Sequence, residues 1–566
     1  MAKETVPAGP IAADTEVDLL VIGSGTGMAA ALAATELGLE ALVVEKSDVV
    51  GGSTARSGGA FWIPPNSVLT ESGADGSAEE VRTYLRALVG DTAPQSRWEA
   101  FVDRGADAVN MLQRTTPLEF FWAKYYSDYH PELPGGSAVG RSVESVPFDA
   151  SRLGDERARL RPGPMAAPVP MPVTGADYKW MNLMRRAPMR AVPTIAKRVA
   201  QGLGGKAIGR EYMAGGQALA AGMFAGLLEA GVPVWTGAEL TELIEEDGRV
   251  VGAVLNQRGR TVTVTARRGV VLAAGGFDHD MPLRQRVQSP SLSEDLSLGA
   301  ESNTGEGISA GEKLGAGTAL MDQSWWFPSF APVGGGAAQV CLAERSLPGS
   351  LIVNQNGDRF INEAVDYMSF GQKVLQLEAE NAPVEEMWLV FDKSYRDSYV
   401  LAGALFPGMA IPDQWYQEGV AAKGSNPGEL AAAMGVPPLA LEGTMRRYNQ
   451  LCKLGVDHDF GRGDNAYDRY YGDPTVHPNP NLRPLEGNLF AVKMVLSDLG
   501  TCGGLSANEK GRVLQSDGSE IPGLYSLGNN AANVFGKSYP GAGATIGQGL
   551  VYGLIIAEDA AARPKR

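Results

Sequence analysis

Residues 17–34 read VDLLVIGSGTGMAAALAA, and this stretch decides the fold. Residues 17–22 are mostly apolar, as in a buried parallel strand, and residues 28–34 are rich in alanine, as in a helix. The glycines between them allow a tight turn, and the start of the helix offers free amide groups and partial positive charge to a pyrophosphate. A strand, a glycine turn and a helix in this order predict a Rossmann-type nucleotide-binding domain.

A second predicted strand, residues 41–44, ends at Glu45, which follows Gly23 by 22 residues. Dinucleotide-binding folds place at this spacing the acid that binds ribose hydroxyls. A tight turn without a ligand would explain the glycines alone, but not the strand and the acid that follow them. The third glycine of the usual pattern is replaced by Met28, and Gly27 or the alanines after it can still allow close packing of the helix on the strand.

Another glycine-rich run, GGSTARSGG at residues 51–59, follows closely behind the second strand. NAD enzymes do not need it, whereas the ribityl chain and ring system of FAD extend past the pyrophosphate and need backbone amides along their path. Residues 269–277 and 523–529 are further apolar strands that end in glycine turns. We therefore expect an FAD-binding domain assembled from separated segments of the chain.

The composition limits the alternatives. A chain of 566 residues is long enough for two or more domains, and a net charge of −16 argues against nucleic acid as a partner. The three cysteines and four histidines lack metal-ligand or redox spacing, so we expect reduced cysteines and no metal site. The sequence shows no signal peptide and no apolar run of eighteen residues, which predicts a cytoplasmic protein that does not span a membrane.

We expect an α/β fold in which a discontinuous Rossmann-type FAD-binding domain carries an inserted α+β catalytic domain. The segments are a disordered N-terminus at 1–15, FAD-binding parts at 16–155, 212–310 and 498–566, a basic and apolar insertion at 156–211, and a catalytic domain at 311–497. At least one of Trp325 and Trp326 is expected to pack in the core of the catalytic domain.

Six stretches along nearly the whole chain carry a family resemblance. They are GSTARSGG (52–59), SDYHPELPGG (127–136), RFINEAVDY (359–367), YDRYYGDPTVHPNPNL (467–482), SDLGTCGG (497–504) and SYPGAGATIG (538–547). The chain resembles the bacterial 3-ketosteroid Δ1-dehydrogenases, within a larger group of flavoproteins that includes the fumarate reductases. The pairing of SDYHPE with YPGAG is the most specific element, because glycine fingerprints are shared by many enzymes. The resemblance implies FAD-dependent 1,2-dehydrogenation of 3-ketosteroids in steroid degradation.

That reaction removes a proton from C2 and a hydride from C1 beside a C3 ketone. It requires hydrogen-bond donors at the carbonyl oxygen, a base near C2 and a flavin N5 that faces C1. The resemblance implies that the Tyr539 hydroxyl and the Gly543 amide bind the carbonyl, that Tyr367 is the base and that Tyr129 assists it. A tyrosine has an ordinary pKa near ~10 and needs a second tyrosine, a cation or a relay to act as a base. Without the resemblance, any one of 17 tyrosines would be assigned to packing.

The glycine motifs and the resemblance together predict the residues that bind FAD. They are Gly23, Ser24, Gly25, Thr26, Gly27, Glu45, Lys46, Gly51, Gly52, Ser53, Thr54, Ser57, Gly58, Gly59, Ala238, Glu239, Ala274, Gly275, Gly276, Asn303, Gly305, Gly528, Asn529, Gly543, Thr545 and Ile546.

The insertion has an unusual charge. Between Asp177 and Glu211 the chain carries eight lysines and arginines and no acidic residue, interleaved with apolar side chains. Such a stretch can lie on an anionic membrane, where a sterol-like substrate dissolves, and residues 178–210 are then a lid at the inner face of the cell membrane. A soluble insertion with a solvated basic face explains the pattern equally well. Pro188 and Pro193 are expected to break any long helix here.

Other functions remain open. A 3-ketosteroid Δ4-(5α)-dehydrogenase shares the flavin and the carbonyl-binding tyrosine. A fumarate reductase-like enzyme would need cations that clamp a dicarboxylate, and none is evident. A flavin-binding or steroid-carrier protein is a third alternative. The expected partners are a 3-ketosteroid and a quinone or other electron acceptor.

Overall fold

The strand expected at residues 17–22 lies in the middle of the main sheet in the computed structural model, which describes residues 13–74, 76–163 and 169–564. This strand, β1 (Thr15–Ile22), pairs in parallel with β2 (Ala41–Glu45) and β11 (Arg260–Leu272). The parallel order continues to β8 (Val234–Thr236) on one side and β21 (Glu520–Ser526) on the other. The antiparallel strands are β9 (Ala238–Glu246), β10 (Arg249–Gln257) and β20 (Arg512–Leu514). One sheet thus joins three separated parts of the chain.

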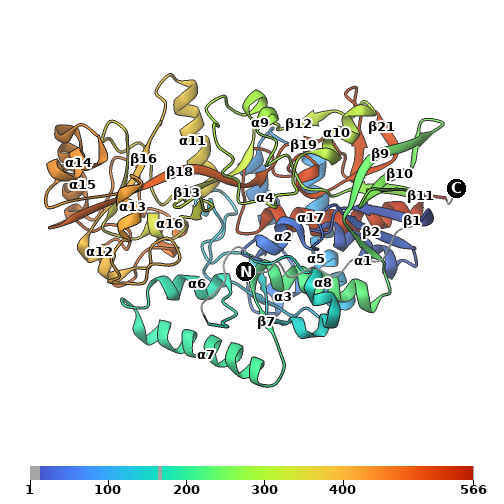
Figure 1. Ribbon diagram of the computed structural model, residues 1–566, viewed down its shortest axis with the longest axis horizontal. Helices are drawn as coiled ribbons and strands as arrows, with labels where there is room; N and C mark the ends of the chain where they lie inside the picture. The colour runs from blue at the N-terminus through green and yellow to red at the C-terminus, as the bar shows by residue number, and fades with distance from the viewer. Residues whose placement is uncertain (1–12, 75, 164–168, 565–566) are drawn as a thin grey trace.

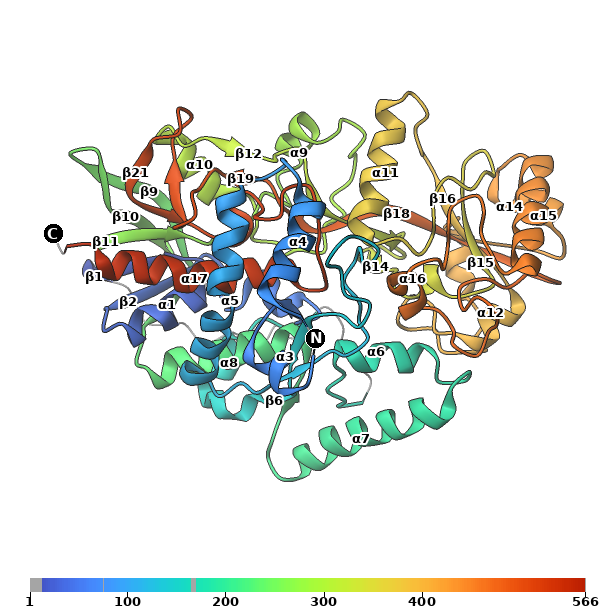
Figure 2. The same ribbon diagram turned by 180° about the vertical axis from the view of Figure 1, so that it is seen from behind.

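Both faces of this sheet are covered, as expected for parallel strands. On one face, Leu19 and Val21 pack among buried residues of the helices α1 (Gly27–Glu36), α5 (Gln95–Thr115), α8 (Gly215–Glu229) and α17 (Ala544–Ala562). On the other face, Leu20 and Ile22 pack among residues of β9, β10 and α10 (Glu306–Lys313). In Figures 1 and 2, α1 and α17 lie side by side next to β1 and β2.

A second, antiparallel sheet forms the other half of the molecule. Its order is β14 (Gln339–Val340), β13 (Ser324–Phe330), β18 (Leu489–Thr501), β16 (Met387–Asp392) and β15 (Ser350–Asn354), with β17 (Ala421–Gly424) also paired to β18. It carries the helices α11 (Tyr367–Ala379), α12 (Lys393–Ser398), α13 (Asp413–Gln417), α14 (Pro427–Met434), α15 (Pro438–Leu454) and α16 (Ala466–Tyr470). In Figure 1 the long strand β18 runs from the far end of this half to the first one. The expected α/β fold class is confirmed.

Shorter elements complete the description. They are α2 (Gly52–Arg56), β3 (Phe61–Trp62), α3 (Ser67–Glu71), α4 (Ala78–Val89), β4 (Phe120–Trp122), β5 (Ser142–Ser145), β6 (Phe148–Asp149), η1 (Ala150–Arg159), β7 (Tyr212–Met213), α9 (Met281–Val287), β12 (Thr318–Ala319), η2 (Glu344–Ser346), β19 (Gly504–Leu505) and η3 (Gly528–Asn530). The borders expected at 155, 310 and 497 fall inside η1, α10 and β18, so we place the segment borders at the ends of these elements.

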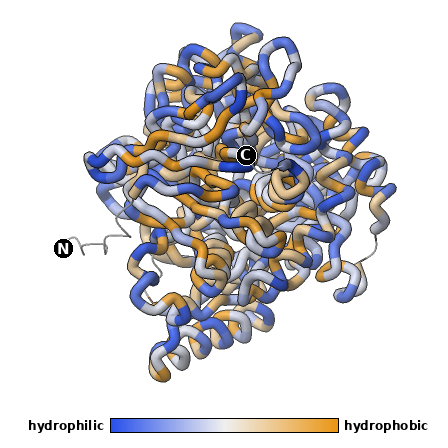
Figure 3. Tube along the Cα trace, turned by 90° about the vertical axis from the view of Figure 1, so that its right-hand side faces the viewer, coloured by the Kyte–Doolittle hydropathy of each residue, from blue (hydrophilic) through white to orange (hydrophobic). Residues whose placement is uncertain are grey.

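The basic insertion forms α6 (Gly175–Asn182) and α7 (Pro188–Ala207), which lie together along the lower edge in Figures 1 and 2. The expectation that two prolines break any long helix here is wrong. Pro188 occupies the first turn of α7, where its missing N–H is not needed, and Pro193 interrupts a single backbone hydrogen bond while the helix continues. In Figure 3, α7 is the lowest segment of the molecule, and it carries both hydrophilic and hydrophobic residues.

Two further sequence predictions concern the ends and the membrane. Most of the disordered N-terminus expected at 1–15 lies outside the described residues, but Thr15 already pairs with Val264 in the main sheet. Within the described residues, no helix combines the length and the apolar composition that a membrane crossing requires.

Candidate active site

One cavity of about 1650 Å³ reaches from the glycine turn after β1 to the space between the two halves of the molecule. All four predicted catalytic residues line it, namely Tyr129, Tyr367, Tyr539 and Gly543. Most of the predicted cofactor residues line it as well: Gly23, Ser24, Gly25, Thr26, Glu45, Lys46, Gly52, Ser53, Thr54, Ser57, Gly58, Gly59, Ala238, Glu239, Ala274, Gly275, Asn303, Gly528, Asn529, Gly543, Thr545 and Ile546. The fold therefore brings together residues that lie more than 500 positions apart in the chain.

Four predicted cofactor residues, Gly27, Gly51, Gly276 and Gly305, do not line the cavity, and their contacts with the rest of the protein are as follows. A Cβ on Gly27 would lie 2.9 Å from the Cβ of Ala273, so Gly27 allows the close helix packing that Met28 cannot. The Gly51 amide donates to the Ser24 hydroxyl at 3.0 Å. A Cβ on Gly276 would lie 1.9 Å from the Thr501 hydroxyl, and Gly305 begins α10 with a φ of 85°.

Glu45 ends β2 at the cavity wall, where its carboxylate is held on both oxygens. The hydroxyl and the amide of Ser24 donate to Oε2 at 2.6 and 3.1 Å. The amide and the hydroxyl of Ser47 donate to Oε1 at 2.9 and 3.0 Å. These four hydrogen bonds fix the carboxylate beside the glycine turn, where dinucleotide-binding folds place the ribose-binding acid.

The described residues fit FAD. No side chain caps the N-terminus of α1 or α17, so both helices present free amides and their positive ends at the cavity. A Cβ on Gly58, which lines the cavity, would meet no protein atom within 4 Å, so the bare backbone faces open space. Uncapped helix ends, a carboxylate and bare glycines are the donor set that a flavin dinucleotide needs.

Polar contacts connect separated segments of the chain around this site. The Ser53 hydroxyl accepts from the Asn303 side-chain amide and from the Ala300 amide, both at 2.9 Å. Asn529 Oδ1 accepts from the Trp325 indole at 3.0 Å and from the Thr545 hydroxyl at 3.1 Å. Trp325 thus belongs to the site, whereas its buried neighbour Trp326 packs in the core, as expected for at least one of them.

Three tyrosines from distant parts of the chain meet at the other end of the cavity. The Tyr129 hydroxyl donates to the Tyr367 hydroxyl at 3.0 Å. The Tyr539 ring lies 5.1 Å from the ring of Tyr129 and 5.2 Å from that of Tyr367, measured between centroids. Trp325 packs on Tyr539 and Phe327 packs on Tyr367, both at 4.8 Å. This cluster is aromatic and buried.

Burial dominates the electrostatics of the cluster. It raises the pKa of Tyr539 to about 12, although Tyr367 and the backbone amides of Thr545 and Gly543 lower that pKa in part. Burial also raises the pKa of Tyr367 and of Tyr129 well above the ordinary value. Tyr539 and Gly543 line the same part of the cavity, where the Gly543 amide lowers the pKa of Tyr539 in part.

The loop that carries Tyr539 is tied to the loop that carries Tyr129. The carbonyl oxygen of Pro540 accepts from the Tyr84 hydroxyl at 2.8 Å and from the Tyr129 amide at 3.1 Å. Buried Asp128 accepts from the indole of Trp62 at 2.9 Å and pairs with Arg141. Tyr84, Asp128 and Arg141 are supporting residues that sequence reasoning missed, because only the fold shows what their side chains contact.

Further aromatic and acidic residues extend the cavity wall. Tyr126 and Tyr471 line it, and the Tyr471 hydroxyl donates to that of Tyr126 at 2.9 Å. Glu144 also lines the cavity, and burial raises its pKa to about 7 while the amides of Ala176 and Gly175 lower it in part. Glu144 was not predicted, since a lone glutamate in a strand carries no sequence signal.

Comparisons with known proteins agree with this geometry. The FAD binding domain family matches residues 18–546. The chain is 43% identical over 561 residues to a 3-oxosteroid 1-dehydrogenase of Mycolicibacterium smegmatis, covering 97% of each chain. It is 34% identical to a 4-oxocyclohex-2-ene-1-carboxylate 5-dehydrogenase of Sinomonas cyclohexanicum, covering 96% of this chain and 93% of that one.

A solved structure is similar over nearly the whole length. It is the 3-ketosteroid Δ1-dehydrogenase of Sterolibacterium denitrificans in complex with 1,4-androstadiene-3,17-dione, at 37% identity and a TM-score of 0.89. The match covers 97% of this chain and 99% of that one.

Proposed function

We propose that this chain is an FAD-dependent 3-oxosteroid 1-dehydrogenase. It belongs to the FAD binding domain family and, within that family, to the group that includes the 3-oxosteroid 1-dehydrogenases. One observation carries the proposal beyond the family. Tyr129, Tyr367 and Tyr539 converge in the same cavity that the flavin-binding residues line. This is the arrangement that C1–C2 dehydrogenation beside a ketone requires.

In this proposal, Tyr539 and Gly543 polarise the C3 ketone. The Tyr539 hydroxyl is a donor throughout the neutral pH range, because burial raises its pKa to about 12. Gly543 begins α17 with a φ of 87°, so its bare amide and the positive end of the helix meet at the same place. Both groups stabilise negative charge as it develops on the oxygen.

In this proposal, Tyr367 removes the proton from C2, and Tyr129 assists it. Their hydroxyls are 3.0 Å apart, so the hydrogen bond from Tyr129 stabilises the tyrosinate that accepts the proton. FAD supplies, when bound, the acceptor for the hydride that leaves C1. Phe327 lines the cavity beside Tyr367, and Trp325 packs behind Tyr539, so this end of the cavity is walled by aromatic rings that limit access of water.

The second candidate is the oxidation of a small cyclic ketone acid, because one relative is named for a 4-oxocyclohexene carboxylate. Such a substrate needs a cation beside the tyrosines to pair with its carboxylate. Five described cations line the cavity, and three of them, Lys46, Arg157 and Arg210, pair with Glu306, Glu211 and Asp149 respectively. Of the other two, Arg56 donates to the Leu298 carbonyl oxygen at 3.2 Å, and Lys206 lies in the last turn of α7. The aromatic cluster therefore favours the steroid.

The test is anaerobic addition of androst-4-ene-3,17-dione to the purified flavoprotein. We expect the flavin band to bleach and the 1,4-diene to form, and 4-oxocyclohexanecarboxylate to leave the band unchanged. Reduction of the flavin by a saturated 3-ketosteroid with formation of a 4-ene would instead support the Δ4-(5α) reaction. Bleaching by the cyclohexane acid alone would overturn the steroid assignment.

We also propose that the insertion contacts an anionic membrane, which would give access to a dissolved steroid and to a quinone as electron acceptor. Large apolar side chains on or beside α7 are exposed, among them Met189 at 88%, Val192 at 58% and Ile208 at 70%. Lys197 and Lys206 lie on the same helix. Arg186, in contrast, is paired with Asp473 and holds the insertion to the rest of the protein, and Arg198 is paired with Asp177 and holds α7 to α6.

Sedimentation with liposomes that contain anionic lipid tests this contact. We expect the wild type to pellet, and the double variant M189S/V192S to stay in the supernatant because it loses apolar anchors. The matched control L439S/L454S removes two exposed leucines of α15 and is expected to pellet like the wild type. Wild-type protein that remains in the supernatant would contradict the proposal.

A further inference from the structure

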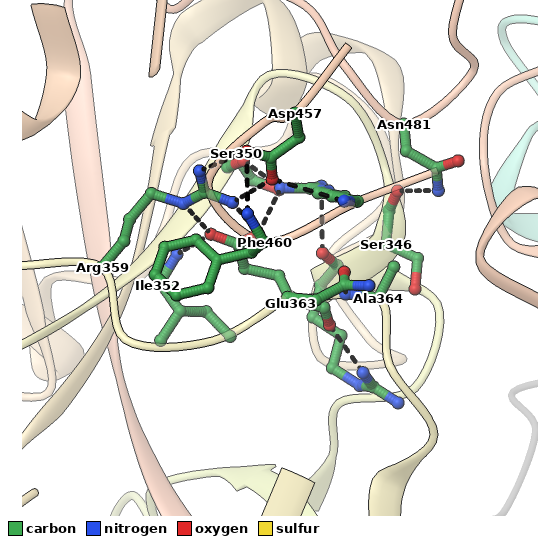
Figure 4. A network of polar contacts seen from close by, with 12 residues as sticks. Ser346, Ser350, Ile352, Arg359, Glu363, Ala364, Asp457, Phe460 and Asn481 are labelled. Carbon is green, nitrogen blue, oxygen red and sulfur yellow. Dashed lines mark hydrogen bonds and ion pairs between the residues drawn. The ribbon is translucent and has the colours of Figure 1, made fainter. Parts of the chain in front are cut away.

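The backbone just before Tyr367 is held by a buried network of charged groups, shown in Figure 4. Glu363 is fully buried, and its carboxylate pairs with Arg359 at 2.7 Å and with Arg462 at 3.2 Å. The amide of Ile352 also donates to this carboxylate, at 3.2 Å. These contacts fasten the start of the 362–367 loop to β15.

The same network extends to the loops around it. Arg359 also pairs with Asp457 at 2.8 Å. Arg462 donates to the carbonyl oxygens of Ser350 at 2.7 Å and of Leu347 at 2.8 Å. Both carboxylates are thus shared among two arginines, and the charges of this part of the network balance.

Arg345 adds a further positive charge to this part of the molecule. Its guanidinium is fully buried and donates through Nη1 to the carbonyl oxygens of Glu363, at 2.6 Å, and of Val365. Among the described residues no carboxylate lies within ion-pair distance of it, and its Nε and Nη2 have no hydrogen-bond partner. An arginine in such surroundings keeps its charge, because its guanidinium is not deprotonated in proteins.

The charge of Arg345 acts on the tyrosines that surround the proposed base. Burial raises the pKa of Tyr126 and of Tyr467, and Arg345 lowers both in part. Tyr467 packs on Tyr129, with ring centroids 4.7 Å apart, and the Tyr129 hydroxyl bonds to that of Tyr367. A positive charge in this low-dielectric cluster favours negative charge on its members.

We propose that Arg345 is a positioning residue for the base: it fixes the backbone that carries Tyr367 and supplies the positive charge that the tyrosine cluster needs to hold a tyrosinate. The inference rests on the proposed function, in which Tyr367 removes the C2 proton. It adds a cation to the two-tyrosine arrangement, which by itself brings no charge to offset the one that develops.

Other titratable and charged groups face the same region, and the experiment leaves these residues unsubstituted. They are Tyr126, Tyr129, Tyr467, Tyr471 and Tyr539 in the cluster, Glu144 on β5, Cys341 and Glu344 beside Arg345, Asp366 with His130, Asp468 near Asn362, and the set Arg359, Glu363, Asp457 and Arg462. None of these residues is itself substituted, and the loss of the Arg345 charge raises the pKa of Tyr126, Tyr467, Asp468 and Cys341 along with that of the base.

The experiment measures the rate of anaerobic flavin reduction by androst-4-ene-3,17-dione against pH in R345Q and R345K. The rate rises with pH as the base loses its proton. In R345Q we expect this rise to move to higher pH by about one unit, which makes reduction about tenfold slower at any pH below it. In R345K, which keeps the charge, we expect the rise to stay near its wild-type position.

The control is R396Q. Arg396 is also buried and donates to two backbone carbonyls, those of Tyr399 at 3.1 Å and Phe406 at 2.8 Å, but it lies outside the tyrosine cluster. We expect R396Q to lower the melting temperature without moving the pH dependence of flavin reduction. A merely structural role for Arg345 would give R345Q the same behaviour.

Two results would overturn the inference. The first is a pH dependence in R345Q that coincides with that of the wild type. The second, available even if R345Q does not fold, is a rise in R345K that moves up by one unit despite the retained charge. Tyr367→Phe separates this failure from that of the proposed function, since wild-type reduction rates in that variant would remove Tyr367 as the base.

Discussion

At the scale of the residue, the proposed function makes the Tyr539 hydroxyl the side-chain donor for the ketone. Tyr539→Phe keeps the packing on Trp325 and Tyr129 but removes the donor. We expect flavin reduction to slow by ~10²–10³-fold, the usual effect of losing one donor to a developing oxyanion. Stopped-flow reduction with a 3-keto-4-ene steroid measures it.

Tyr448→Phe is the matched control for this prediction. Tyr448 is fully buried and its hydroxyl has no hydrogen-bond partner among the described residues. Its removal should leave flavin reduction unchanged, and equal losses in the two variants would contradict the assignment of Tyr539.

The pH dependence follows from the same phenols. Burial raises the pKa of Tyr367 and Tyr129 well above the ordinary value, so the deprotonated base becomes more abundant as the pH rises. The donor Tyr539 keeps its proton, because burial raises its pKa to about 12. We therefore expect the rate of flavin reduction to increase steadily from pH 6 to about pH 10. A rate that falls above neutral pH in the stable enzyme would contradict these roles.

Gly58 tests the cofactor part of the cavity. A side chain at this position would project into space that no protein atom fills, so Gly58→Val should obstruct FAD and leave the fold intact. We expect at least about tenfold weaker FAD binding in a fluorescence titration of the apoprotein, roughly 1.4 kcal/mol. Gly204→Val on α7, where a side chain also meets no protein atom, should bind FAD like the wild type.

At the scale of the element, the loop before α17 depends on helix α4. The Tyr84 hydroxyl on α4 donates to the Pro540 carbonyl, next to Tyr539. Tyr84→Phe removes a buried hydrogen bond, which should lower the free energy of unfolding by about 1 kcal/mol in denaturant titrations. Because the Tyr129 amide still donates to this carbonyl, flavin reduction should slow only a few fold. Complete loss of activity would show that the hydrogen bond from Tyr84 alone holds this loop in position.

At the scale of the whole molecule, the cofactor site draws on strands and helices from three separated segments of the chain. FAD therefore contacts parts of the protein that unfolding would separate, and it should stabilise the native state by mass action. At a free concentration one hundredfold above its Kd, the gain is about 2.7 kcal/mol. Calorimetry of apoprotein and holoprotein should show a melting temperature that rises with added FAD, and equal values for both would contradict a shared site.

The sequence by itself determined the Rossmann-type half and its cofactor. Its signals are local: an apolar strand, a glycine turn, an alanine-rich helix and an acid 22 residues on occur within one short stretch, 17–45. Gly23 and Glu45 could be assigned for that reason. Tyr367 and Tyr539 were found only because motifs around them resemble a family, since a tyrosine carries no periodic signal of its own.

Only the tertiary structure decided which side chains meet. The structure shows hydrogen bonds that join residues far apart in the chain: Tyr129 to Tyr367, Tyr84 to Pro540 and Trp325 to Asn529. The hydrogen bond from Arg345 to the Glu363 carbonyl likewise has no local sequence signal. The same applies to α7, where sequence reasoning expected Pro193 to end a helix that in fact continues past it. Contacts at long sequence separation arise from packing of whole elements, and no local pattern of residues encodes them.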